Sequence, residues 1–144
     1  GIVRTVSVSN VVIGKDGKPT TESLNKVMKQ LSDKSGNGGE IEGAYIISDK
    51  FKEMNDYAKG KMSKNSDPDR KPYSITGNSC ATFAEDVITQ DKSVDKPKSI
   101  INSPRNIVDE YQEEGNARVQ YNPRTNTTTI GTGNEEDAKI RINN

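Results

Sequence analysis

The stretch Tyr73-Ser-Ile-Thr-Gly-Asn-Ser-Cys80-Ala-Thr-Phe-Ala84 decides the fold, because here a loop turns into a helix at the chain's single cysteine. The residues just before the cysteine are small and polar, as is typical of loops and helix caps. Apolar residues then recur at helical spacing. The pattern predicts a helix over residues 80–89 with these side chains facing inward: Phe83, Ala84, Val87 and Ile88.

Amphipathic helices are predicted on both sides of this stretch. One begins at Thr20 or Thr21, ends near Leu31 and has an apolar face of Leu24, Val27, Met28 and Leu31. Another follows a cap at Ser48 or Asp49, with an apolar face of Phe51, Met54, Tyr57, Ala58 and Met62. A short helix over 105–112 has Pro104 in its first turn, where proline is tolerated.

Strands are predicted at residues 2–13 and 40–47, and a hairpin joins 117–121 to 127–130. The elements together predict an α+β fold, with helices packed on a small antiparallel sheet. We expect one domain over residues 1–131, followed by a polar, frayed tail over 132–144.

Composition limits the function classes. Only 29% of the 144 residues are hydrophobic, so we expect part of the fold to come from sequence outside this chain, with the domain incomplete at its N-terminus. The 21 basic residues are matched by 21 acidic ones without a long basic block, which argues against nucleic-acid binding. No signal peptide and no run long enough to span a membrane are predicted.

Cys80 is the candidate catalytic residue. A helix N-terminus favours a thiolate, the nucleophilic form of cysteine, because its free N–H groups and dipole stabilise the anion. The backbone N–H of Cys80 could also polarise a substrate carbonyl. A single cysteine is more often a small packing residue, however, so spacing alone leaves both interpretations open.

The cysteine segment resembles permuted papain-like, NlpC-type cysteine peptidase domains, which occur at the ends of bacterial Rhs-repeat and polymorphic-toxin proteins. That family has a tyrosine, a short loop, Asn-Asn-Cys and then a helix opening with a small residue, Thr and an aromatic. Here the motif reads Asn78-Ser79-Cys80, with serine replacing the second asparagine. The resemblance covers about half the chain, residues 40–112. It implies a secreted or delivered effector, a peptidase or amidase, that uses Cys80 as nucleophile.

The chain departs from that family because it contains no histidine. A cysteine hydrolase needs a general base to activate the thiol and to protonate the leaving group. A histidine could come from an N-terminal half or a second chain, or Lys71 or Asp86 could substitute for it. Otherwise the domain is a catalytically inactive binding module, or a structural fragment of a toxin-delivery protein. An immunity protein or a target protein is a further expected partner.

Two residues near the cysteine are weaker candidates. Tyr73 could place its hydroxyl at the oxyanion site or simply anchor the loop, and Asn78 could orient substrate or cap the helix. The neighbouring acids Glu85 and Asp86 are expected to face solvent. No metal site and no cofactor are predicted, because the acids near Asp67 lack the spacing of a calcium loop.

Overall fold

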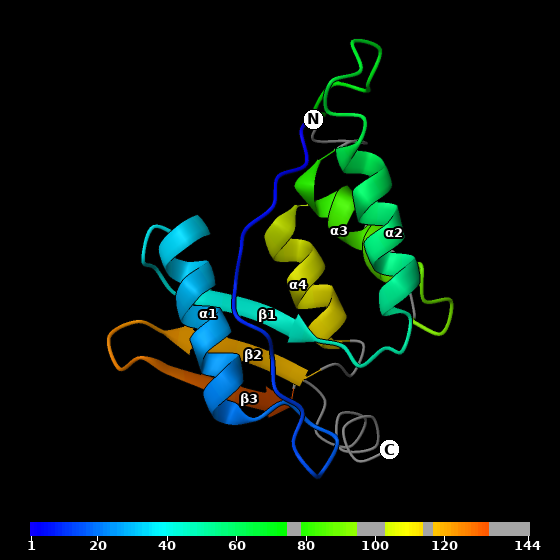
Figure 1. Ribbon diagram of the computed structural model, residues 1–144. Helices are drawn as coiled ribbons and strands as arrows, with labels where there is room; N and C mark the ends of the chain where they lie inside the picture. The colour runs from blue at the N-terminus through cyan, green and yellow to red at the C-terminus, as the bar shows by residue number, and fades with distance from the viewer. Residues whose placement is uncertain (75–78, 95–102, 114–116, 133–144) are drawn as a thin grey trace. The chain divides into compact units, whose positions relative to one another are not determined.

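The computed structural model describes residues 1–74, 79–94, 103–113 and 117–132, in which four helices and a three-stranded antiparallel sheet confirm the α+β prediction. The chain divides into two compact units (Figure 1). The first unit comprises Gly1–Arg4 and Ile47–Glu114, and the second comprises Thr5–Ile46 and Gly115–Asn144. The single domain over 1–131 stays a prediction. The tail predicted beyond Thr132 lies outside the described residues, as does the predicted candidate Asn78.

The second unit is built from one helix and the sheet. Strand β2 (Ala117–Asn122) pairs antiparallel with β1 (Ile41–Tyr45) and with β3 (Thr127–Thr132), in the order β1-β2-β3. Side chains along β2 alternate between buried and exposed, as in a sheet with one covered face. Helix α1 (Thr21–Ser35) packs on β2 and β3. This arrangement confirms the predicted hairpin and the predicted small sheet.

Apolar packing between α1 and the sheet forms the core of the second unit. Met28 is buried against Val119 and Tyr121, and partly buried side chains surround this cluster: Leu24, Leu31, Ile41 and Tyr45. Full burial of one such side chain contributes roughly 1.5–3 kcal/mol. Helix α1 runs past the predicted end at Leu31 because Ser32 is itself buried, with its hydroxyl bonded to the carbonyl oxygen of Gly39.

The predicted strand over residues 2–13 is wrong. This segment forms only an isolated bridge between Ile13 and Pro19. Side chains, rather than a neighbouring strand, hold its backbone: Gln30 accepts from the Ser9 N–H at 2.6 Å, and Ser23 accepts from the Val12 N–H at 2.9 Å. Alternating valines favour a strand only where a pleated, half-buried surface receives them, and four valines here are exposed: Val6, Val8, Val11 and Val12.

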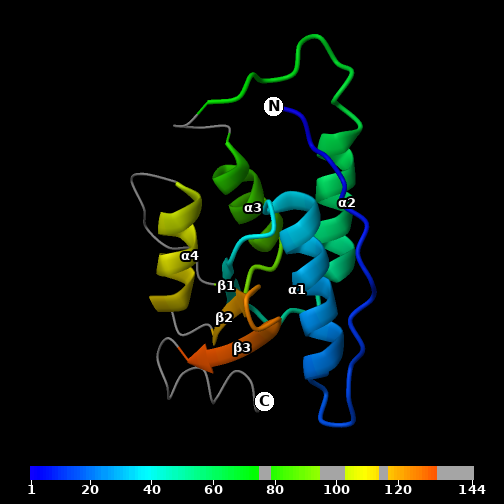
Figure 2. The ribbon, with the colours of Figure 1, turned by 90° about the vertical axis from the view of Figure 1, so that its left-hand side faces the viewer.

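Three helices form the first unit: α2 (Phe51–Met62), α3 (Cys80–Ile88) and α4 (Pro104–Glu113). Helix α3 lies between α2 and α4 and contacts both (Figure 2). Among the described residues of this unit, the buried apolar ones come from α3, the turn after it and α4: Ala81, Val94, Ile107 and Tyr111. The bounds of α3 and α4 agree with the prediction.

Several side chains in the first unit differ from the prediction. Helix α2 has Lys50 at its N-cap without a side-chain cap bond, although the Ser48 hydroxyl accepts from the Lys50 N–H at 3.0 Å. Phe51, expected on the apolar face, is 75% exposed. Ala84 is exposed, whereas Glu85, expected in solvent, is only 4% exposed. Helix α4 covers this side of α3, so tertiary packing overrides the expectation for adjacent acids.

Candidate active site at the start of α3

Cys80 is the first helical residue of α3, and two reciprocal hydrogen bonds fix this helix start. The Ser79 hydroxyl accepts from the Thr82 N–H at 3.3 Å, while the Thr82 hydroxyl accepts from the Ser79 N–H at 2.7 Å. This capping box satisfies donors that would otherwise lack acceptors. Ser79 and Ala81 are buried on either side, whereas Cys80 is exposed. An exposed side chain does not suit a buried packing residue, and the role of Cys80 as nucleophile stays a prediction.

Cys80 opens onto a cavity of about 520 Å³ within the first unit. Helix α3 lines it with Cys80, Phe83 and Asp86, which lie at i, i+3 and i+6 on one face. Helix α2 contributes Tyr57 and Lys61 at i and i+4. The cavity can therefore place a small acyl group against the thiol. A ligand pocket typically encloses a few hundred cubic ångströms or more, so this volume suits a peptide fragment or another small substrate.

The α2 wall of the cavity is organised around Tyr57. Its hydroxyl donates a hydrogen bond to the Asp86 carboxylate at 3.2 Å, and its ring centroid lies 6.4 Å from that of Phe83. Lys61 Nζ lies 5.9 Å from the Tyr57 ring centroid, within cation–π range. Burial raises the pKa of Tyr57, and the Asp86 charge and hydrogen bond raise it further. Tyr57 therefore stays a neutral hydrogen-bond donor at physiological pH.

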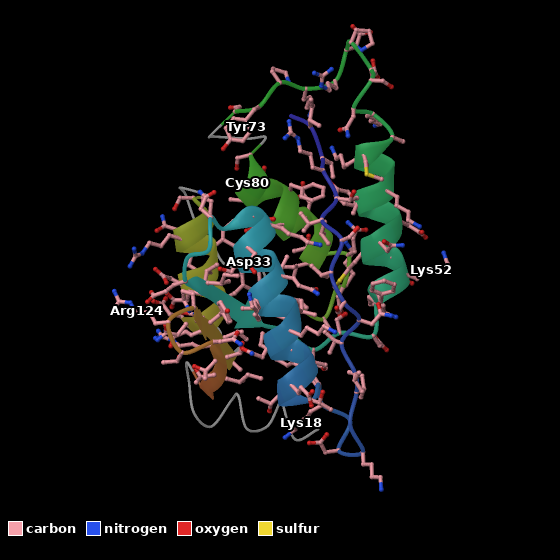
Figure 3. The ribbon with its side chains drawn as sticks, turned by 60° about the vertical axis from the view of Figure 1, so that its left-hand side comes forward. Lys18, Asp33, Lys52, Tyr73, Cys80 and Arg124 are labelled. Atoms are coloured by element: carbon pink, nitrogen blue, oxygen red, sulfur yellow. The ribbon has the colours of Figure 1, made fainter. Side chains whose placement is uncertain are left out.

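The other residues predicted for the site differ in their position in the cavity and in the groups that they contact. Tyr73 lines the cavity and is 60% exposed, so its ring is not a buried anchor for the loop. Figure 3 shows Tyr73 on the segment beside the start of α3, near Cys80. Lys71 and Asp86, the alternatives to a histidine, also line the cavity. Asp86 is bonded to Tyr57, and its position two helical turns from Cys80 does not suit direct proton transfer.

Glu85 lies away from the cavity and acts on a different residue. Burial raises the pKa of Tyr111 on α4 to about 12, with smaller contributions from the charges of Glu85 and Glu110. Tyr111 is 1% exposed. Glu85 is therefore part of the α3–α4 packing and not a group that could orient a catalytic base.

Tyr57 and Lys61 are site residues that sequence reasoning missed. Their i, i+4 spacing puts them on one face of a helix, but the same spacing is equally typical of core packing, which is how Tyr57 was interpreted. The N-terminal residues Ile2 and Val3 also line the cavity. Asn65 holds this segment, donating to the Val3 carbonyl oxygen at 2.7 Å and accepting from the Val3 N–H at 2.8 Å. Only the folded chain reveals that contact.

The described residues show neither a metal-binding cluster nor a membrane-spanning helix. They contain no group of three or more cysteine, aspartate or glutamate residues arranged to hold a metal ion. None of their helices is long and apolar enough to cross a membrane.

Comparison with known proteins places this site in a family context. A family model described as "Type VI secretion system effector TseH-like" matches residues 1–97, a range that includes Cys80 and all of α3. The crystal structure of a type VI secretion system effector, TseH, is similar with a TM-score of 0.81 and 32% sequence identity. The match covers 89% of this chain and 69% of that chain. No curated protein sequence matches.

Proposed function

The chain belongs to the TseH-like family of type VI secretion system effectors, a family of bacterial secreted effectors, and on that premise we propose that it acts as a cysteine peptidase or amidase with Cys80 as the nucleophile. One observation carries the proposal: an exposed cysteine at a capped helix start opens onto a cavity large enough for substrate. The papain-like, NlpC-type resemblance supplies the reaction class. The predicted Rhs or polymorphic-toxin context stays a prediction.

The proposed reaction has two steps. The Cys80 sulfur attacks the substrate carbonyl carbon, the carbonyl oxygen becomes an oxyanion, and the bond to the leaving group breaks as that group takes up a proton. Water then hydrolyses the resulting thioester, which releases the acid and restores the thiol. The Cys80 N–H belongs to the first turn of α3, whose N–H groups have no acceptor within the helix, so it can donate to the oxyanion. Tyr73 is the proposed second donor.

The base in this proposal is a histidine outside the 144 residues, because the chain has none. The similar effector structure is consistent with such a source, since 31% of that chain lies outside the match that covers 69% of it. A histidine on a flanking segment or on a second chain would have to reach the cavity beside Cys80. An immunity protein or target protein is proposed as a further partner that binds this same surface.

A second candidate function is a catalytically inactive module that binds a peptide or glycan in the same cavity. The absence of histidine from this chain favours it, because the chain itself then supplies no papain-type base. The two candidates differ in what Cys80 does. In the enzyme its sulfur becomes acylated, whereas in the binding module it only lines the cavity.

Hydrolysis by the complete effector tests the enzyme proposal. Wild-type, Cys80→Ala and Cys80→Ser effectors are incubated with peptide amides and with purified peptidoglycan, and circular dichroism checks that each variant is folded. We expect turnover by the wild type and its loss by about 10³-fold or more in Cys80→Ala. Equal turnover by folded Cys80→Ala would exclude Cys80 as the nucleophile. Substrate binding without turnover in either protein would favour the inactive module.

A further inference from the structure

Residues Gly1–Arg4, here called the N-terminal strap, line the Cys80 cavity without forming a helix or a strand. They belong to the same compact unit as Cys80. Their side chains make little use of core packing, since Ile2 is 55% exposed and only Val3 is partly buried. A wall segment held by few apolar contacts opens at a lower free-energy cost than a packed helix does.

One side chain holds the backbone of the strap. Asn65, which follows α2, accepts from the Val3 N–H at 2.8 Å and donates from Nδ2 to the Val3 carbonyl oxygen at 2.7 Å. A side-chain amide has both a donor and an acceptor, so it pairs with Val3 as a neighbouring strand would. A further bond runs from the Gly1 nitrogen to the Lys71 carbonyl oxygen at 2.8 Å. Hydrogen bonds, more than packing, therefore keep the strap on the wall.

The strap lies against a residue of the proposed site. A Cβ atom built on Gly1 would lie 3.8 Å from Cδ2 of Tyr73, which places the Gly1 backbone beside that ring. Tyr73 is the proposed second donor to the oxyanion, and it lines the cavity together with Cys80. The bound strap therefore fills space next to both groups, and its departure would widen the cavity where they lie.

We propose that the N-terminal strap is an autoinhibitory element, which narrows the Cys80 cavity while Asn65 holds Val3 and admits bulky acyl substrates when it is released. This inference rests on the proposed function, because it concerns the regulation of the same site. A net hydrogen bond of ordinary strength changes an equilibrium by a factor of about 2 to 10, so loss of both Asn65 bonds should favour release about 5- to 100-fold. Reaction with a bulky reagent is slowed by the fraction of molecules that remain closed.

Two neutral maleimides of different size report on the strap. With either reagent the Cys80 sulfur bonds to one alkene carbon, the double bond is lost, and the other alkene carbon takes up a proton in place of the one that the thiol gives up. N-(1-pyrenyl)maleimide is bulky and rigid, whereas N-ethylmaleimide is small. Their rate ratio on the 144-residue chain, divided by the same ratio for N-acetylcysteine amide, measures how far the cavity is narrowed. We expect about 0.2 or less for the wild type.

Variants of the clamp should open the cavity. Asn65→Ala loses both bonds and should raise the normalised ratio about fivefold or more, while Asn65→Asp keeps an acceptor, loses the donor and should raise it at least about twofold. Val3→Pro removes the N–H from the strap and leaves Asn65 in place, so it tests the same bond if Asn65→Ala does not fold. Amide exchange at Val3, followed by NMR, should accelerate in both Asn65 variants.

Gln30→Ala is the matched control. Gln30 also holds the N-terminal segment by its amide, accepting from the Ser9 N–H at 2.6 Å and donating to the Ser9 hydroxyl at 2.9 Å, but it lies in the second unit. It should leave the ratio unchanged. Faster Val3 exchange with an unchanged ratio would overturn the gating and leave the nucleophile standing, and unchanged Val3 exchange in Asn65→Ala would overturn the clamp. Failure of both maleimides to label Cys80 in native protein would overturn the proposed function instead.

Discussion

Removal of the capping box at the start of α3 should destabilise the protein measurably, because this box holds Cys80 at the first helical position. Ser79→Ala deletes the acceptor of the Thr82 N–H, a bond of 3.3 Å, and retains the backbone. Loss of an N-cap serine typically costs 0.5–2 kcal/mol, about 1 kcal/mol on average. Ser79 is 7% exposed, so water cannot easily replace the lost acceptor, and we expect a cost of about 1–2 kcal/mol.

The reciprocal bond gives a second, coupled perturbation. Thr82→Val deletes the hydroxyl that accepts from the Ser79 N–H at 2.7 Å and keeps the β-branched shape. We expect a cost of about 1 kcal/mol from this single change. The double variant should lose less stability than the sum of the losses in the two single variants. Both bonds belong to one local structure, so the loss of either bond already weakens the other.

Thr20→Ala provides the matched control. The Thr20 hydroxyl caps α1 through a bond from the Ser23 N–H, also of 3.3 Å, but it belongs to the second unit. Urea unfolding should show a similar loss of about 1 kcal/mol for this control. Hydrogen–deuterium exchange should then separate the variants: Ser79→Ala should accelerate exchange at the first turn of α3, and Thr20→Ala should not. Unchanged stability and exchange in Ser79→Ala would refute the role given to the box.

Three further substitutions test the packing inside each unit taken by itself. Hydrogen bonds from Ser48 and Ser93 lower the pKa of Asp91 to about 2, below its usual 3.8. The charged carboxylate therefore stabilises the folded protein, and this stability should be lost as the pH falls from about 4 to 2. Asp91→Asn should lower stability at pH 7 and flatten that acid dependence in unfolding titrations. Burial raises the pKa of Tyr111 to about 12, so stability should fall as pH rises from 10 to 12, and Tyr111→Phe should remove this alkaline loss. Met28→Ala should cost about 2–5 kcal/mol in urea unfolding, whereas a cost below 1 kcal/mol would contradict its place in the core.

Local sequence signals predicted the elements whose periodicity matched their burial. The spacing of Leu24, Met28 and Leu31 identified α1 and its core face, and the β-prone run from Ala117 to Tyr121 identified β2. Small polar residues before Cys80 placed the start of α3 correctly. In each case the local pattern and the tertiary packing impose the same conformation.

The structural features that the sequence did not predict depend on contacts between residues far apart in the chain. The valines before Ile13 favoured a strand, but the backbone there bonds to side chains such as Gln30 instead. The burial of Glu85 depends on α4, more than fifteen residues away in sequence. The cavity likewise combines residues from the N-terminal segment, α2 and α3, so its Tyr57–Asp86 pair has no compact sequence signature.

Acylation of Cys80 by p-nitrophenyl acetate tests the central claim most directly. The thiol attacks the acetyl carbonyl and releases p-nitrophenolate, leaving an acetyl thioester on the protein. The 144-residue chain should give a burst of about one equivalent of p-nitrophenolate with little later turnover, because it lacks a histidine to drive deacylation. Mass spectrometry should place the acetyl group on Cys80, and Cys80→Ala should show no burst. A burst of equal size in folded Cys80→Ala, or acetylation of Cys80 only after denaturation, would contradict the account.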